Sequence, residues 1–279
     1  MRRIILACAI AGVLGVPAVA QEKVSFPSTD GDLKGRTPTT IAGYLYKPAG
    51  SGPFAAVVSM PGCGGVVDEK GEIYSWSAQW GEILSRAGYI VLWVDSFRPR
   101  GQSDQCVGSI TILPEVPRDA FGGLNYLQSR PDVRPNSIAI MGQSYGGSAT
   151  LFAIADGALP KDVAPKTDFR AAVGLYPTCI RIQDAHWRPR QPMLLLMGES
   201  DNGGSLAICK ELVAHAGPLI DAHFYPNAHH LFDAPNLPVT VTSLKTPSPD
   251  GHLLIVGSNH EARADAINRV MQFLSKQLQ

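Results

Sequence analysis

The sequence predicts an α/β fold in which helices cover both faces of a mostly parallel, twisted β-sheet. Two observations predict it. Short runs rich in β-branched and aromatic residues recur along the chain, and most are continuously apolar, as expected of strands that are buried on both faces. Segments with the apolar periodicity of helices lie between these runs, and this alternation is typical of a parallel sheet with right-handed crossovers. Ligands of such sheets bind at the carboxyl ends of the strands.

The elements follow one another in a regular order. In chain order we predict strands at residues 43–46 and 55–60, a helix at 75–86, a strand at 89–95, a helix at 117–129, a strand at 137–141, a helix at 144–155, strands at 171–176 and 193–197, a helix at 205–216, a strand at 222–225 and a helix at 261–276. Pro and Gly residues cluster at 48–53, 98–109, 159–166 and 233–251. We interpret these clusters as loops rather than domain boundaries, because the alternation of strands and helices resumes after them.

The composition fits one globular domain over residues 21–279. The chain has 279 residues, of which 45% are apolar and 17% are charged, so it can bury a large core. Lys plus Arg and Asp plus Glu number 24 each, and the sequence has no stripe of basic residues. The charge pattern therefore indicates neither a nucleic-acid partner nor binding to an anionic membrane surface. It does not determine the oligomeric state.

The first 20 residues have the pattern of a secretory signal peptide. Arg2 and Arg3 precede an apolar run at residues 4–16, and small residues at 18–20 form a cleavage site, so we expect cleavage after Ala20. The apolar run is shorter than the roughly 20 residues that span a bilayer. We therefore expect a periplasmic or secreted protein with no stable membrane insertion after cleavage.

The mature chain would keep four cysteines, an even number in an oxidising compartment. They are Cys63, Cys106, Cys179 and Cys209. Of the three possible pairings we favour Cys63 with Cys106 and Cys179 with Cys209, because each pair would join loops at the same end of the predicted sheet. Four unpaired buried thiols are the alternative.

The most informative segment is residues 140–147, where Ser144 lies between Gly142 and Gly146 after an apolar strand. A Gly-x-Ser-x-Gly turn between a strand and a helix is the nucleophile elbow of serine hydrolases, in which residues without side chains avoid collision with the neighbouring elements. Packing or phosphate binding are the alternative functions of a Gly-rich turn. The residues that follow favour the elbow.

A serine nucleophile requires an imidazole to accept its proton and a carboxylate to orient the imidazole. In hydrolases with such an elbow the acid and then the histidine follow the serine in the chain. Asp201 follows the apolar strand at 193–197, and Glu199 is the alternative acid; we prefer Asp201 because it lies further out of the strand. His229 and His230 both lie in the loop after the last predicted strand. The pattern of residues leaves the choice between these two histidines open.

The elbow also predicts an oxyanion hole made of backbone N–H groups. Tyr145, the residue after the serine, supplies one donor. The second comes from the loop after an earlier strand, and residues 60–65 (MPGCGG) suit that position, with Cys63 donating through its main chain. A plain turn or a reactive free thiol are the alternatives for this segment.

Together these segments resemble the dienelactone hydrolase family of α/β-hydrolases, in its secreted bacterial branch. The resemblance covers residues 42–274 and rests on residues 142–147 (GQSYGG), 197–201 (MGESD) and 225–232 (YPNAHHLF). The family's Ala-x-His-x-Phe pattern assigns the catalytic histidine to His230. The enzymes that gave the family its name carry cysteine at the elbow and glutamate in the oxyanion segment, whereas this chain has Ser144 and the run at 61–65. These departures argue against dienelactone itself as the substrate.

The resemblance implies a serine hydrolase that cleaves small-molecule carboxylic esters or lactones through an acyl-enzyme, with Ser144, Asp201 and His230 as its triad and with no metal or organic cofactor. Arg98 and Arg100, in a segment similar to a family loop beside the site, are candidates for contact with an acidic substrate group, and solvation is the alternative. Trp76 is a candidate wall of an apolar pocket, and packing is the alternative. A peptidase of the prolyl oligopeptidase type and a non-catalytic binding protein on the same fold are the alternative functions.

Overall fold

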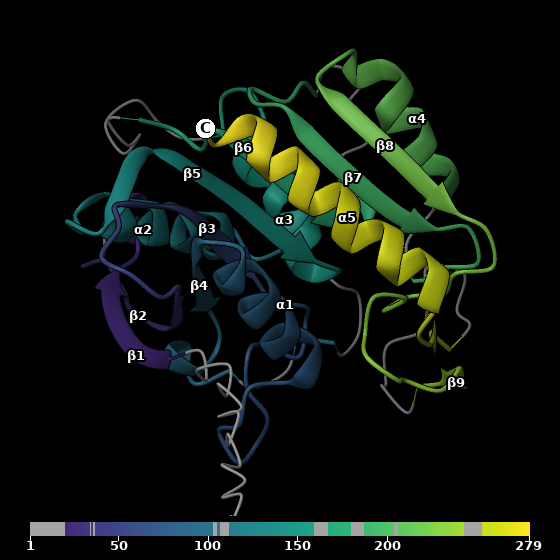
Figure 1. Cartoon of the computed structure of the whole chain (residues 1–279), viewed down its shortest axis with the longest axis horizontal. Helices are drawn as coiled ribbons and strands as arrows, with labels where there is room; N and C mark the ends of the chain where they lie inside the picture. Colours follow the sequence, from purple (N-terminus) through teal and green to yellow (C-terminus); the bar gives the residue numbers. More distant parts are fainter. Residues whose placement is uncertain are drawn as a thin grey trace, which may run out of the picture.

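The computed structural model of the protein describes residues 20–33, 35, 37–102, 105–106, 112–158, 167–179, 187–203, 206–242 and 253–279. An eight-stranded sheet with the strand order β1-β2-β4-β3-β5-β6-β7-β8 forms its centre (Figure 1). The strands are β1 (Ala20–Pro27), β2 (Thr40–Lys47), β3 (Phe54–Met60), β4 (Tyr89–Asp95), β5 (Val133–Gln143), β6 (Ala171–Leu175), β7 (Met193–Gly198) and β8 (Ile220–Tyr225). β1 and β2 run antiparallel at one end of the sheet, and the strands from β4 to β8 are parallel.

Helices cover both faces of this sheet. α1 (Ser75–Arg86) and α5 (His260–Gln277) lie over one face, which is turned towards the viewer in Figure 1. α2 (Glu115–Gln128), α3 (Tyr145–Ile154) and α4 (Leu206–Ala216) pack on the other. Successive strand residues alternate between the two cores, as Val57 and Val58 of β3 do. The continuous apolar runs of the sequence follow from this double burial, and the predicted fold class is confirmed.

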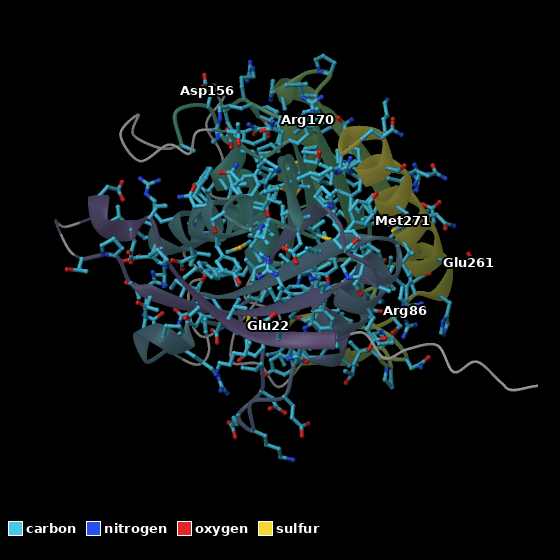
Figure 2. All side chains as sticks on the ribbon, turned by 60° about the vertical axis from the view of Figure 1, so that its left-hand side comes forward. Glu22, Arg86, Asp156, Arg170, Glu261 and Met271 are labelled. Atoms are coloured by element: carbon cyan, nitrogen blue, oxygen red, sulfur yellow. A yellow bond between two sulfur atoms is a disulfide. The ribbon has the colours of Figure 1, made fainter. Side chains whose placement is uncertain are left out.

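Charged side chains at the ends of two helices lie on the outer surface. Arg86 at the end of α1 and Glu261 at the start of α5 are exposed, and Figure 2 shows both at the periphery of the molecule. Two single-turn 3₁₀ helices, η1 (Asp30–Asp32) and η2 (Arg98–Arg100), lie in connections. None of the described helices combines the length and the apolar character that a bilayer-spanning segment needs.

The structure differs from the sequence prediction at three strands. β1 was not predicted, and neither was the small separate ribbon of β9 (Thr240–Val241) and β10 (Ile255–Val256), part of which falls in the expected loop at 233–251. The loop prediction at 159–166 and the signal peptide apart from Ala20 lie outside the described residues. The signal peptide and the single-domain boundary therefore stay predictions.

Candidate active site

The turn between β5 and α3 presents Ser144 at the carboxyl edge of the sheet. Its φ of 52° and ψ of −114° are unusual for a residue with a side chain, and such strain costs about 1–3 kcal/mol. Its N–H donates to the carbonyl of Leu175 in β6 at 2.9 Å. A Cβ on Gly142 would lie 2.0 Å from the carbonyl oxygen of Gly146, and a Cβ on Gly146 would lie 2.1 Å from that of Met60. Only glycine fits on both sides of the serine, as the elbow motif requires.

The loop that follows β8 brings His230 to the same edge. Its Nε2 lies 2.9 Å from Oγ of Ser144, and its Nδ1 lies 2.8 Å from Oδ2 of Asp201. The backbone is held as well, because the N–H of Gly257 donates to the carbonyl of His230 at 3.0 Å and His230 forms a parallel bridge with Val256 of β10. Both His230 and Asp201 are buried. In this arrangement the carboxylate orients the ring so that Nε2 can accept the hydroxyl proton.

Asp201 lies in the turn after β7, where both of its carboxylate oxygens have partners. Oδ1 accepts from the N–H of Gly203 at 2.8 Å, and Oδ2 faces His230. The alternative acid, Glu199, is exposed and pairs with Lys210 at 3.3 Å. The structure thus joins Asp201, and not Glu199, to the imidazole.

Two backbone segments adjoin the elbow where an oxyanion would form. A Cβ on Gly62 would lie 3.8 Å from Cβ of Ser144, so the Gly-rich segment after β3 passes directly beside the serine. Cys63 is the next residue, and a disulfide joins it to Cys106. Tyr145 begins α3, and the N–H groups of a first helical turn have no acceptor within their own helix. The arrangement suits an oxyanion hole built from the N–H groups of Cys63 and Tyr145.

The second disulfide joins Cys179, in the segment after β6, to Cys209 of α4. The two disulfides are those that the sequence analysis favours.

The two arginines proposed as substrate contacts have different surroundings. Arg100 donates to Asp119 at 2.7 Å and to Asp30 at 2.8 Å, and only 13% of its side chain is exposed. These two carboxylates give Arg100 a structural role, and its contact with a substrate stays a prediction. Arg98 is exposed and donates to the backbone carbonyl of Asp68.

Trp76 lies in the first turn of α1 and is partly buried. Its ring stacks on Tyr74, with ring centroids 4.5 Å apart and planes 10° from parallel. Tyr74 in turn adjoins the Gly-rich segment, since a Cβ on Gly64 would lie 4.0 Å from the phenol oxygen. The stacked pair thus borders the segment that carries the predicted oxyanion donor, and Trp76 stays a candidate substrate contact.

A second carboxylate, which the sequence analysis does not identify, lies near the triad. Asp233 is fully buried and accepts hydrogen bonds from Trp80 Nε1 at 2.6 Å, the Tyr176 hydroxyl at 2.7 Å and Gln143 Nε2 at 2.9 Å. Burial raises the pKa of Asp233, and the three hydrogen bonds oppose that rise. Burial and the neighbouring charge of Asp233 raise the pKa of Tyr176 well above its ordinary value, so its hydroxyl remains a proton donor. The Tyr176 ring packs edge-on against His230, with centroids 4.7 Å apart.

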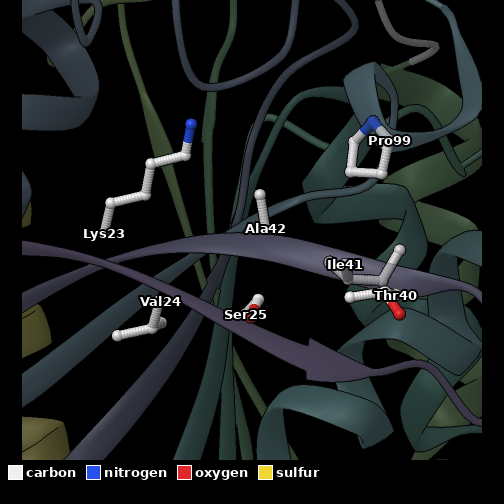
Figure 3. A pocket seen from close by; sticks show the side chains of 7 residues that line it. All are labelled: Lys23, Val24, Ser25, Thr40, Ile41, Ala42 and Pro99. Atoms are coloured by element: carbon white, nitrogen blue, oxygen red, sulfur yellow. The ribbon is translucent and has the colours of Figure 1, made fainter.

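The pocket shown in Figure 3 is separate from these groups. It has a volume of about 310 Å³, is lined by residues of β1 and β2 together with Pro99, and contains the charged side chain of Lys23. Another pocket of about 310 Å³ lies between the end of β8 and the start of α5. No triad residue lines either one. Within the part of the chain that the structure describes, no group of three or more His, Cys, Asp or Glu side chains is arranged to hold a metal ion.

Comparisons with known proteins agree with this fold. A model of the dienelactone hydrolase family matches residues 41–278. The fold is similar to that of a dienelactone hydrolase-like promiscuous phosphotriesterase from metagenomic libraries, with a TM-score of 0.64, 18% identity, and coverage of 93% of this chain and 100% of that one. It is also similar to a Pyrococcus furiosus esterase, with a TM-score of 0.60, 15% identity and 94% coverage of each chain.

A similar fold also occurs within a much longer peptidase. Dipeptidyl peptidase 4 of Porphyromonas gingivalis gives a TM-score of 0.60 and 17% identity, and the match covers 93% of this chain but 36% of the peptidase. The comparison with curated protein sequences gave no match.

Proposed function

Because the chain belongs to the dienelactone hydrolase family and is therefore a hydrolase acting on ester bonds, we propose that it cleaves carboxylic esters or lactones through a covalent acyl-enzyme formed on Ser144. One observation supports this most strongly. Oγ of Ser144, the ring of His230 and the carboxylate of Asp201 are joined in series by contacts of 2.9 and 2.8 Å. Three segments distant in the sequence thus supply a nucleophile, a base and an orienting acid.

The proposed reaction has two halves. Ser144 attacks the ester carbonyl while His230 Nε2 takes the hydroxyl proton, and the buried carboxylate of Asp201 stabilises the imidazolium. His230 then returns the proton to the leaving alcohol, and the acyl group stays on the serine. In the second half His230 activates a water molecule that releases the acid.

Charge on the substrate oxygen develops in both halves. The N–H groups of Cys63 and Tyr145 would stabilise that oxyanion, and each such donor is typically worth about 3–4 kcal/mol of barrier. Such donors accelerate the reaction because they are already in place before the charge forms.

We also propose export of the protein to the periplasm or the cell exterior. The pattern of residues 1–20 supports it, and so do the two disulfides, which persist in oxidising compartments. Removal of the leader after Ala20 would leave Gln21 as the second residue of β1 and the first of the mature chain.

Replacement of the nucleophile tests the catalytic proposal. Ser144→Ala should lower the turnover of p-nitrophenyl acetate and p-nitrophenyl butyrate at least about 10³-fold, because no other group can form the acyl-enzyme. Circular dichroism should show an unchanged fold. Undiminished ester cleavage by Ser144→Ala would refute the assignment.

A peptide p-nitroanilide tests the peptidase alternative in the same assay. We expect the wild-type protein to cleave the esters and to leave the anilide intact. Efficient cleavage of the anilide, lost in Ser144→Ala, would make the protein a peptidase. No turnover of either substrate class would favour a binding protein.

A further inference from the structure

The carboxylate of Asp233 takes no part in the proposed reaction, yet it is completely buried and accepts hydrogen bonds from side chains of three separate segments. Trp80 belongs to α1, Gln143 ends β5, and Tyr176 directly follows β6. A buried carboxylate is costly unless hydrogen bonds replace its hydration. Here all three donors to the carboxylate are neutral, whereas Arg263 donates to the backbone carbonyl of Asp233, at 3.1 Å.

The protons in this cluster can be assigned from its contacts. The Tyr176 oxygen accepts from Gln143 Nε2 at 3.1 Å, so its own proton is directed to Asp233 Oδ1. Asp233 Oδ2 accepts from both Trp80 Nε1 and Gln143 Nε2. Three donors on two oxygens match an ionised carboxylate, which only accepts hydrogen bonds. Hydrogen bonds to an ionised acceptor are shorter and stronger than neutral ones.

Two of these donors also touch the catalytic machinery. The Tyr176 ring meets the His230 ring edge to face, at an interplanar angle of 62°. Gln143 immediately precedes Ser144, so the hydrogen bond that holds its side chain also restrains the start of the strained elbow. Asp233 therefore lies where one group can fix the positions of both the base and the nucleophile.

We propose that Asp233 is a positioning residue for the ester-cleaving reaction, and that it acts on His230 through the hydroxyl and ring of Tyr176. The proposal rests on the proposed function. The hydrogen bond from the Tyr176 hydroxyl to Asp233 fixes the orientation of the Tyr176 ring. That ring packs against the His230 imidazole and limits how far the imidazole can rotate. Without that bond the imidazole would sample orientations in which Nε2 no longer faces the serine, and misplacement at a reacting centre is costly.

Tyr176→Phe is the decisive variant, because it keeps the ring against His230 and removes only the hydroxyl, with its bonds to Asp233 and Gln143, while Gln143 keeps its own bond to Asp233. Its kcat for p-nitrophenyl butyrate should fall about 10-fold or more with KM unchanged, since the effect is on the geometry of proton transfer and not on substrate binding. The rate at which a fluorophosphonate labels Ser144 should fall in parallel. Asp233→Asn should lower both rates at least as much.

Trp80→Phe is the matched control. It also removes one donor from the same carboxylate, but Trp80 lies in α1, and the ring that packs against His230 is that of Tyr176. Trp80→Phe and Tyr176→Phe should both lower the melting temperature, whereas only Tyr176→Phe should lower kcat and the labelling rate. The double variant Asp233→Asn with Tyr176→Phe should be no slower than Asp233→Asn, because both changes break one chain of contacts.

Two results would overturn the inference. One is a wild-type kcat in Tyr176→Phe, and the other is an equal loss of kcat in Trp80→Phe, which would indicate a general loss of rigidity. If the proposed function fails, Ser144→Ala keeps its activity. If only this inference fails, Ser144→Ala is inactive while Tyr176→Phe matches the wild type.

Discussion

At the scale of single residues, two neighbouring histidines have different surroundings. His230 contacts both Ser144 and Asp201, whereas His229 places its Nδ1 3.0 Å from the backbone carbonyl oxygen of Ser200. The backbone turns sharply after the pair, since Leu231 has a φ of 59°. Adjacent side chains of such a loop point in different directions. His230 can therefore act in catalysis while His229 only contacts the backbone of a neighbouring turn.

The two histidines should therefore respond differently to substitution. His230→Ala should abolish labelling of Ser144 by a fluorophosphonate, because the hydroxyl loses its general base. His229→Ala should still be labelled, because it loses only the contact between the His229 ring and the backbone carbonyl of Ser200. Mass spectrometry of the labelled protein measures both. Labelling that persists in His230→Ala and disappears in His229→Ala would show that the roles are reversed.

The triad could be predicted from the sequence, whereas the buried carboxylate could not. Ser144 and Asp201 each follow a strand whose apolar run is visible in the sequence, and the order of Ser144, Asp201 and His230 along the chain is that of a known mechanism. Asp233 has no such local signal. Its three partners lie 57, 90 and 153 positions away, so only the folded chain reveals the contact.

At the scale of elements, strands with long apolar runs could be predicted, whereas a polar edge strand and two very short strands could not. β3, β4 and β7 are nearly continuous apolar runs, so their predicted positions are correct to within a few residues. β1 is an edge strand in which, from residue 21 onwards, Val24 and Phe26 turn inward and the other residues are exposed. β9 and β10 have two residues each, too few to show any periodicity.

The unpredicted strand β10 is held directly beside the triad. The Asn202 amide donates to the carbonyl of Leu253 at 3.0 Å and accepts from the N–H of Ile255 at 2.9 Å. Because these two hydrogen bonds hold the residues on either side of Leu254, they also fix the position of its backbone. A Cβ on Gly203 would lie 2.4 Å from Cδ1 of Leu254 and 3.2 Å from Nδ1 of His230, so this methyl group adjoins the imidazole across the glycine.

Two adjacent leucines allow a controlled test of this contact. Leu254→Ala should lower kcat about 10-fold, because water admitted beside the bond between His230 and Asp201 weakens it electrostatically. Leu253 is 53% exposed, so Leu253→Ala should leave kcat unchanged. Steady-state kinetics with p-nitrophenyl butyrate measures both. Equal kcat values in the two variants would show that Leu254 does not shield the triad.

At the scale of the whole molecule, the chemistry and the covalent cross-links gather at one edge of the sheet. Each of the four cysteines in the two disulfides lies in a segment that follows a parallel strand. Cys63 and Cys106 follow β3 and β4, and Cys179 and Cys209 follow β6 and β7. The carboxyl edge of a parallel sheet is built from loops, which lack the regular hydrogen bonds of the strands. Cross-links placed here restrain the part of the fold that carries the site.

The two disulfides should therefore contribute similarly to the stability of the protein but differently to its kcat. They close loops of 43 and 30 residues, and loop entropy predicts that each contributes about 4 kcal/mol to the free energy of unfolding. Urea denaturation of the two double-alanine variants, one for each disulfide, should show similar losses in the free energy of unfolding.

Removal of the disulfide between Cys63 and Cys106 should also lower kcat, because Cys63 carries a proposed oxyanion donor whose position the disulfide restrains. Removal of the bond between Cys179 and Cys209 should leave kcat near the wild-type value. If both variants kept the full kcat, the prediction would be wrong. The packing of the Gly-rich segment against Ser144 would then hold Cys63 in position without the disulfide.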